Sequence, residues 1–188
     1  GYSVQQTGDG GYIVAGTYYV TTFEKYYPYL VKTDAAGNLQ WENTFSEGGY
    51  FTGAKAVVQT RDGGYIFTSA PVAYTLGSVL LIKTNAAGAV QWQKSMGDGG
   101  IISGNSLHQT SDGGYLLSGL VFDNFDIHII KTDVTGTMRW RKSFPDWLED
   151  SYYFLNPMCV QPTTDGGYIL GGDIVHSEVG GSYAGLRK

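Results

Sequence analysis

The chain has 188 residues and a formal charge of -5, from 17 acidic and 12 basic side chains. This length predicts one domain or slightly more, and the acidic balance lacks the basic surface of nucleic-acid-binding proteins. With 42% apolar and 14% aromatic residues the chain can form a packed core, so its 28 glycines do not indicate a collagen-like or disordered protein. Because no apolar run approaches about 18 residues, we expect no membrane span.

Two sequence strings recur with a period of about 50 residues. The string Asp-Gly-Gly-Tyr begins at Asp9, Asp62, Asp112 and Asp165. The string Lys-Thr-Asp/Asn-x-x-Gly-x-x-x-Trp begins at Lys32, Lys83 and Lys131. Because a period of about 40 to 50 residues with strand-like content is typical of propeller blades, the repeat predicts blades.

The first repeat is most simply divided into four short strands. Residues 3–7 and 11–17 flank an Asp-Gly-Gly turn, whose glycines tolerate positive φ, and this pattern predicts a hairpin. Residues 28–33 and 39–45 flank Asp34–Gly37, where an aspartate and a glycine favour a second tight turn. Since no segment has apolar residues at helical spacing over ten positions, we predict an all-β protein.

The repeats predict about four blades in a single β-propeller domain or sector. Their boundaries fall at about 1–48, 49–99, 100–146 and 147–188. The last blade ends at Leu186–Lys188, which corresponds to Leu30–Lys32, so we expect it to lack its fourth strand. Propellers leave only short, protected edges, so a longer parent chain, an oligomer that supplies the strand, or a small four-bladed ring are the alternatives. We favour the longer chain because the repeat is cut at both ends.

These strings resemble the DGGY-type repeats of bacterial and archaeal secreted and cell-surface proteins, with a consensus close to SIQQTSDGGYIVAGST…YLIKTDANGNIQWSKTFGG. Three units match over nearly their full length and the fourth over its first part. The half-motif that ends in tryptophan is also similar to the tryptophan-docking repeats of quinoprotein dehydrogenases and outer-membrane assembly scaffolds. The resemblance implies four-stranded propeller blades and an extracellular or cell-surface protein, and it brings no cofactor with it.

Residues that recur once per repeat are expected to be structural. A periodic tryptophan is interpreted as a wedge between blades, packed over a neighbouring turn. We expect each repeat lysine to pair with the Asp or Asn that follows it in the chain, or to lie along the sheet. Each Asp-Gly-Gly turn offers one carboxylate, which is too few for a calcium loop. The residues assigned to these structural roles are Trp41, Trp92, Trp140, Asp9, Asp62, Asp112 and Asp165.

Few residues are suited to catalysis or to metal binding. The three histidines, His108, His128 and His176, lie at different repeat positions and not at metal-ligand spacing. The lone cysteine, Cys159, corresponds to small residues at the start of strand one, so we expect a packed side chain and no nucleophile. We therefore expect no catalytic residues, no metal and no cofactor.

The connections at one end of the blades vary in length and are rich in aromatic residues. Tyrosine and tryptophan suit protein interfaces and sugar stacking, because one end of the side chain is apolar and the other forms hydrogen bonds. The predicted ligand-binding residues are Tyr26, Tyr27, Tyr50, Phe51, Trp147, Tyr152 and Tyr153. The alternative is that these aromatics only cover the open end of the ring.

Three functions are compatible with the sequence. The first is a non-catalytic, extracellular or cell-surface module that binds a protein or a glycan through the aromatic face. The second is a structural brick of a larger surface protein or filament. The third is a propeller enzyme domain, quinone-dependent or glycan-cleaving, which the scattered histidines disfavour. We expect the binding module.

Overall fold

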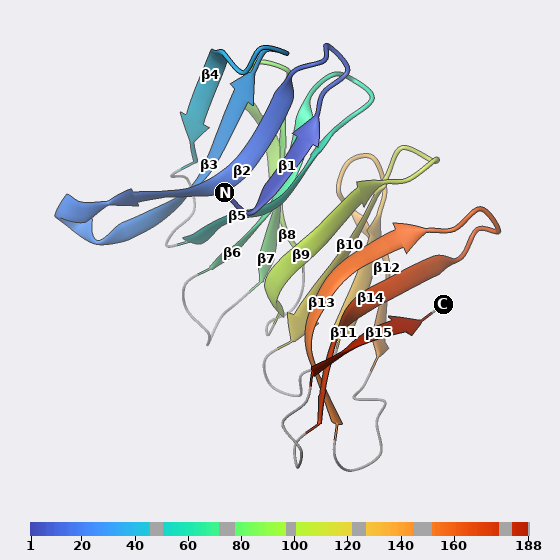
Figure 1. Cartoon of the computed structure of the whole chain (residues 1–188). Coiled ribbons are helices and arrows are strands. Elements are labelled where there is room, and N and C mark those ends of the chain that lie inside the picture. The colour runs from blue at the N-terminus through green and yellow to red at the C-terminus, as the bar shows by residue number, and fades with distance from the viewer. Residues whose placement is uncertain are drawn as a thin grey trace.

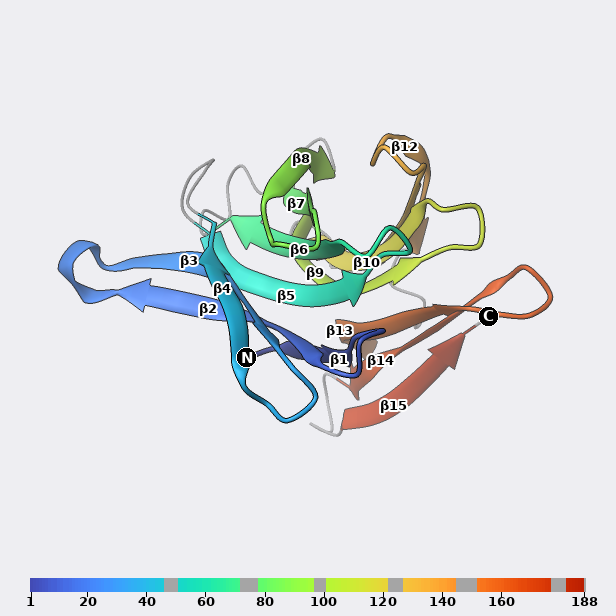
Figure 2. The same ribbon diagram turned by 90° about the horizontal axis from the view of Figure 1, so that it is seen from above.

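A computed structural model describes residues 1–45, 51–71, 78–96, 101–121, 127–144, 152–176 and 182–187. Its strands form four antiparallel sheets in chain order, three with four strands and one with three. The first strand of each sheet lies toward the middle of the molecule (Figures 1 and 2). These features confirm the predicted all-β propeller fold with an incomplete last blade.

The strands follow the repeat along the chain. The first sheet contains β1 (Ser3–Gln6), β2 (Tyr12–Val20), β3 (Lys25–Thr33) and β4 (Leu39–Thr44), with a short 3-10 turn, η1 (Thr21–Phe23). The second contains β5 (Phe51–Gln59), β6 (Tyr65–Pro71), β7 (Val79–Thr84) and β8 (Val90–Met96). The third contains β9 (Ile101–Gln109), β10 (Tyr115–Val121), β11 (Ile127–Thr132) and β12 (Met138–Phe144). The fourth contains β13 (Tyr152–Pro162), β14 (Tyr168–His176) and β15 (Ser182–Arg187).

The two glycines of each Asp-Gly-Gly turn have different roles. In the second sheet Gly63 has a φ of +79°, a conformation that residues with a side chain rarely adopt, and the space around it is open. A Cβ on the next residue, Gly64, would lie 2.2 Å from the carbonyl oxygen of Thr84. The first glycine therefore permits the turn, and the second lets the start of β6 approach the end of β7.

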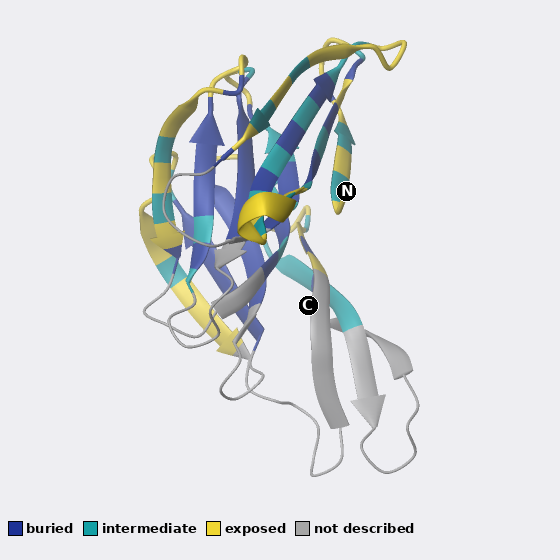
Figure 3. Cartoon of the chain, turned by 90° about the vertical axis from the view of Figure 1, so that its left-hand side faces the viewer, coloured by how far each residue is buried: buried dark blue, intermediate teal, exposed yellow. Residues whose placement is uncertain are grey.

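The core lies between adjacent sheets. Figure 3 shows buried residues filling the inner strands, with exposed residues at the turns and along the outer strands. Between the first and second sheets Ile13, Leu30, Phe67 and Ile82 belong to one buried cluster. The strand pattern explains this, because alternate residues of a strand face opposite sides and each sheet packs on its neighbours. Among the described residues, no helix is long and apolar enough to cross a membrane.

The connection between β2 and β3 differs from the prediction. The sequence predicts that the first of these strands ends at residue 17 and the second begins at residue 28, with a loop between them. Instead β2 continues to Val20 and β3 starts at Lys25, with Tyr18 paired to Tyr27 and Tyr19 to Tyr26. Tyrosine and valine favour strands, and facing aromatic pairs stabilise a hairpin. The first sheet therefore carries a hairpin that projects beyond it (Figures 1 and 2).

Candidate functional site

Each of the first three sheets contains a buried lysine that joins its two hairpin turns. In the second sheet, Lys83 Nζ lies 2.9 Å from the Asp62 carboxylate. The same ammonium donates to the Thr84 carbonyl oxygen at 2.8 Å and to Gln91 Oε1 at 3.0 Å. A buried charge is costly unless it is paired and hydrogen-bonded. These contacts satisfy the ammonium group, so this cluster stabilises the sheet.

The same ion pair recurs in the neighbouring sheets, between Lys32 and Asp9 at 2.9 Å and between Lys131 and Asp112 at 2.8 Å. The expected pairing of each lysine with the following turn residue is wrong. Both turns lie at the same end of the sheet, so the lysine reaches the Asp-Gly-Gly turn instead. Asp34, which follows the first repeat lysine, accepts backbone N–H bonds within its own turn.

These contacts lower the pKa of the repeat aspartates. For Asp9 and Asp112 the largest cause is the hydrogen bond from the lysine, followed by the bond from the threonine two residues earlier. For Asp62, burial raises the pKa, but hydrogen bonds from its threonine, lysine and glycine partners outweigh burial and the pKa is lowered. The folded protein therefore favours the ionised form of all three carboxyl groups.

We expect the free energy of unfolding to fall when the pH drops below the ordinary aspartate pKa of 3.8. Below that value the unfolded chain binds protons that the folded chain does not, so stability rises with pH across this window. The contribution is complete above pH 3.8 and is lost as the pH falls toward the lower pKa of the folded state. Urea unfolding at a series of pH values measures the slope. Asp112→Asn should make that slope shallower, and an unchanged slope would contradict this assignment.

The repeat tryptophans lie between adjacent sheets, each against the tyrosine that opens the second strand of the next sheet. The ring pairs and their centroid distances are Trp41 and Tyr65 at 5.5 Å, Trp92 and Tyr115 at 6.0 Å, and Trp140 and Tyr168 at 5.7 Å. The Trp92 ring also covers the last hairpin turn of the third sheet, where a Cβ on Gly136 would lie 2.6 Å from it. The positions of these tryptophans are thus explained by packing between sheets.

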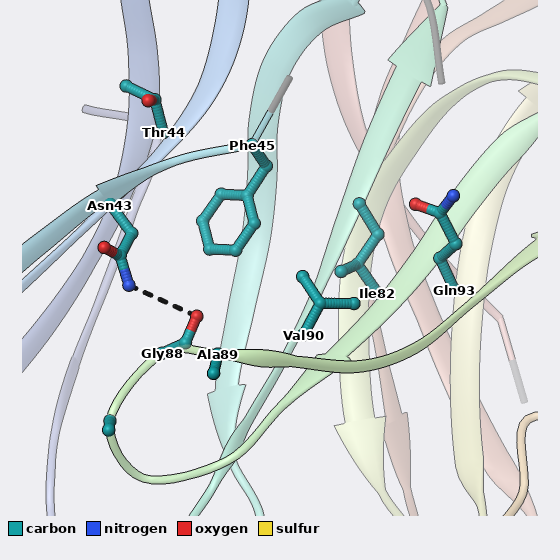
Figure 4. Close-up of a pocket in the computed structure, with 9 residues that line it drawn as sticks. Asn43, Thr44, Phe45, Ile82, Gly88, Ala89, Val90 and Gln93 are labelled. Carbon is teal, nitrogen blue, oxygen red and sulfur yellow. Dashed lines mark hydrogen bonds between the residues drawn. The ribbon is translucent and has the colours of Figure 1, made fainter. Parts of the chain in front are cut away.

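A pocket of about 440 Å³ lies between the first and second sheets. Phe45 and Ile82 form its apolar part, while Asn43 and Gln93 place amide groups in its wall (Figure 4). Asn43 Nδ2 donates to the Gly88 carbonyl oxygen at 3.2 Å (Figure 4). None of its nine lining residues has a titratable side chain. These residues can hold a ligand by contact and hydrogen bonding. The pocket was not predicted, because it brings together residues that are 45 positions apart, such as Asn43 and Gly88.

The hairpin of β2 and β3 exposes a group of aromatic residues, which includes Tyr26 of the predicted ligand-binding set. The exposed fractions are 49% for Tyr18, 44% for Tyr19, 66% for Phe23 and 48% for Tyr26. The rings of Tyr19 and Tyr26 lie 4.6 Å apart across the hairpin. Tyr27 is half-buried and pairs with Tyr18 on the opposite face of the hairpin. The hairpin thus presents aromatic rings on both of its faces.

The other predicted ligand-binding residues are only partly described. Tyr50 and Trp147 lie outside the described residues, and the side chains of Phe51, Tyr152 and Tyr153 are outside them as well. The backbones of these last three begin the first strands of the second and fourth sheets.

The described histidines and the cysteine lie on three different strands. His176 ends β14, and its side chain is outside the described residues. His128 Nε2 lies 2.9 Å from Ser143 Oγ across β11 and β12, and His108 is on β9, where burial lowers its pKa. Cys159 is exposed, so its expected packed position is wrong. Its counterpart Ser106 is covered by the following sheet, and no described sheet follows the fourth. In the described part of the chain, no three His, Cys, Asp or Glu side chains form a metal-binding group.

Comparison with known proteins gives a fold and no family. No protein-family model and no curated protein matches the chain. A crystal structure of a protein of unknown function from Bacteroides caccae is similar, with a TM-score of 0.56 and 12% identity over 95% of this chain. An ACO/RPE65 chimera, a propeller fold, has a TM-score of 0.50 and 13% identity over 93% of this chain. This chain spans 58% and 45% of the lengths of those two proteins, and both likenesses concern the fold alone.

Proposed function

We propose that this protein is a non-catalytic propeller module that binds a protein or a glycan through the hairpin of β2 and β3. The observation that carries the proposal is the group of exposed aromatic rings on a hairpin that projects from its sheet. Large exposed aromatics are uncommon on surfaces without a partner, and tyrosine combines apolar area with a hydroxyl group. The resemblance to secreted repeat proteins supports an extracellular or cell-surface location.

The double substitution Tyr19→Ser with Tyr26→Ser should weaken binding by about tenfold or more, because two stacked rings leave the contact surface. A glycan array probed with the whole chain measures this, and a subset of glycans should give signal. Val4→Ser is the matched control, since Val4 is 66% exposed on the same sheet but lies outside the hairpin. The free energy of unfolding should change little in both variants.

Two outcomes would count against this proposal. Equal signal from every sugar on the array would remove the glycan version and leave the protein version. Loss of binding in Val4→Ser to the same degree as in the double variant would show that the hairpin is not the binding element.

The structural brick remains a second candidate, because the outer face of the first sheet is open. Tyr12 is 39% exposed, whereas its counterpart Tyr65, covered by a tryptophan, is 2% exposed. Val4 and Leu39 are exposed on the same sheet, at 66% and 57%. A face of this kind is suited to stacking against a further blade. A sedimentation coefficient that rises with protein concentration would indicate self-association. Loss of this self-association in Val4→Asp would favour this function.

A further inference from the structure

A glutamine at the end of the first strand of a sheet joins that sheet to the Asp-Gly-Gly turn of the preceding sheet. Gln59 Oε1 accepts the backbone N–H of Gly8 at 2.7 Å, and Gln109 Oε1 accepts that of Arg61 at 2.9 Å. Gln109 Nε2 also donates to the carbonyl oxygen of Gly113 in its own turn at 3.2 Å. A carboxamide group thus connects a donor on one sheet with an acceptor on the next.

The fourth sheet has a proline at this position, Pro162, which has no amide side chain. By the repeat, the corresponding donor is the backbone N–H of Ser111 and the corresponding acceptor is the carbonyl oxygen of Gly166. Both residues line a cleft of about 170 Å³ between the third and fourth sheets. Where the other interfaces hold a glutamine carboxamide, this interface is therefore open to a ligand.

The cleft favours a neutral ligand. It is lined by Lys131 and Asp112, but Lys131 Nζ already donates to both oxygens of that carboxylate and to the Thr132 carbonyl oxygen. The ammonium charge is therefore compensated, and an anionic ligand would meet the exposed carboxylate. A neutral group that carries one acceptor and one donor meets no such penalty.

The remaining lining residues suit a sugar. Tyr168 places a half-buried ring in the cleft, packed 5.7 Å from Trp140. Thr110 and Thr163 each donate a hydroxyl proton to the aspartate of their own turn, which leaves their oxygens as acceptors. The exposed Asp112 carboxylate can also accept from sugar hydroxyls. The cleft is smaller than the about 300 Å³ typical of sites for drug-sized ligands, so it accommodates one residue of a larger ligand.

We propose that this cleft binds the acetamido group of an N-acetylated amino sugar. The acetamido carbonyl oxygen accepts the Ser111 N–H, its N–H donates to the Gly166 carbonyl oxygen, and the sugar ring lies against Tyr168. The ligand group thereby takes the place that the Gln109 side chain occupies one interface earlier. This site is separate from the hairpin of β2 and β3, so it does not depend on the proposed function.

Titration of the 15N-labelled whole chain with N-acetylglucosamine tests the proposal. The Ser111 amide resonance should shift with saturation, and glucose, which lacks the acetamido group, should bind about tenfold more weakly or worse. Pro162→Gln should weaken binding by about tenfold or more, because the new side chain fills the site as Gln109 does. Pro162→Ala is the matched control, since it also removes the proline but leaves the site open, and it should bind like the unaltered chain.

Four results would overturn the proposal. They are the absence of a saturable shift at Ser111, equal binding of glucose, unchanged binding in Pro162→Gln, and binding of the tripeptide Gly-Gln-Gly in place of the sugar. The last result would assign the cleft to a peptide carboxamide. None of them concerns the hairpin aromatics, so failure here is distinguishable from failure of the proposed function.

Discussion

Replacement of Trp92 by alanine is expected to lower the free energy of unfolding by about 3–5 kcal/mol, the usual cost of removing a large packed ring. The Trp92 ring packs against Tyr115 of the next sheet and against the turn at Gly136. Its loss leaves a cavity between two sheets, and the surrounding packing closes such a cavity only in part. Urea unfolding followed by circular dichroism measures the change.

Tyr19→Ala is the matched control for Trp92→Ala, because it also removes an aromatic ring. Tyr19 is 44% exposed and contacts Tyr26 on the projecting hairpin. Its loss should cost about 1 kcal/mol or less. If the two substitutions lowered stability equally, the separation of tryptophans between the sheets from exposed hairpin aromatics would be wrong.

Replacement of Gly64 by alanine is expected to destabilise the protein by about 3 kcal/mol, because the added Cβ overlaps backbone atoms. It would lie 2.2 Å from the Thr84 carbonyl oxygen and 2.5 Å from Lys83 Nζ. The lysine can adjust, but the carbonyl belongs to the strand that pairs with β6 and cannot move alone. Thermal and urea unfolding of the variant measure the loss.

The preceding glycine provides the control for Gly64→Ala. Gly63→Asn adds a side chain at φ +79°, where a Cβ would have nothing within 4 Å. Asparagine tolerates this conformation, so the cost should be about 1 kcal/mol or less. If Gly63→Asn lowered the free energy of unfolding more than Gly64→Ala, close packing of the strands would not explain the second glycine. Turn conformation would then be the stronger constraint on this turn.

Much of the fold was predictable because each blade is local in sequence. The Asp-Gly-Gly and Lys-Thr-Asp turns join strands a few residues apart, and their glycines and aspartates specify the turns. The strand order and the three-stranded last sheet both follow from this local pattern. The full length of β2 and β3 was not predicted. Tyr18 and Tyr26 occupy a loop position in the repeat, and that position was given more weight than the strand propensity of tyrosine.

The candidate sites depended on contacts that the repeat does not reveal by itself. Tyr26 and Tyr27 of the hairpin were predicted as binding residues because their position between two strands is visible in the sequence. The pocket beside Phe45 and the cleft beside Pro162 were not predicted, since each requires two sheets whose residues are about 50 positions apart. The substitution of Pro162 for a repeat glutamine was visible in the sequence, but the glutamine had no known role until its bond to the neighbouring turn was seen.

Turn chemistry and strand alternation act over a few residues, so the blade, its period and its recurring residues are specified locally along the chain. The partner of each recurring residue depends instead on how the sheets pack. Lys83 bonds to Asp62 and not to the adjacent Asn85, and Trp92 packs on the next sheet and not on its own. A charge without a partner is costly only where it is buried, and a ring stabilises the fold only where it is packed. Which groups are buried together depends on how the sheets pack.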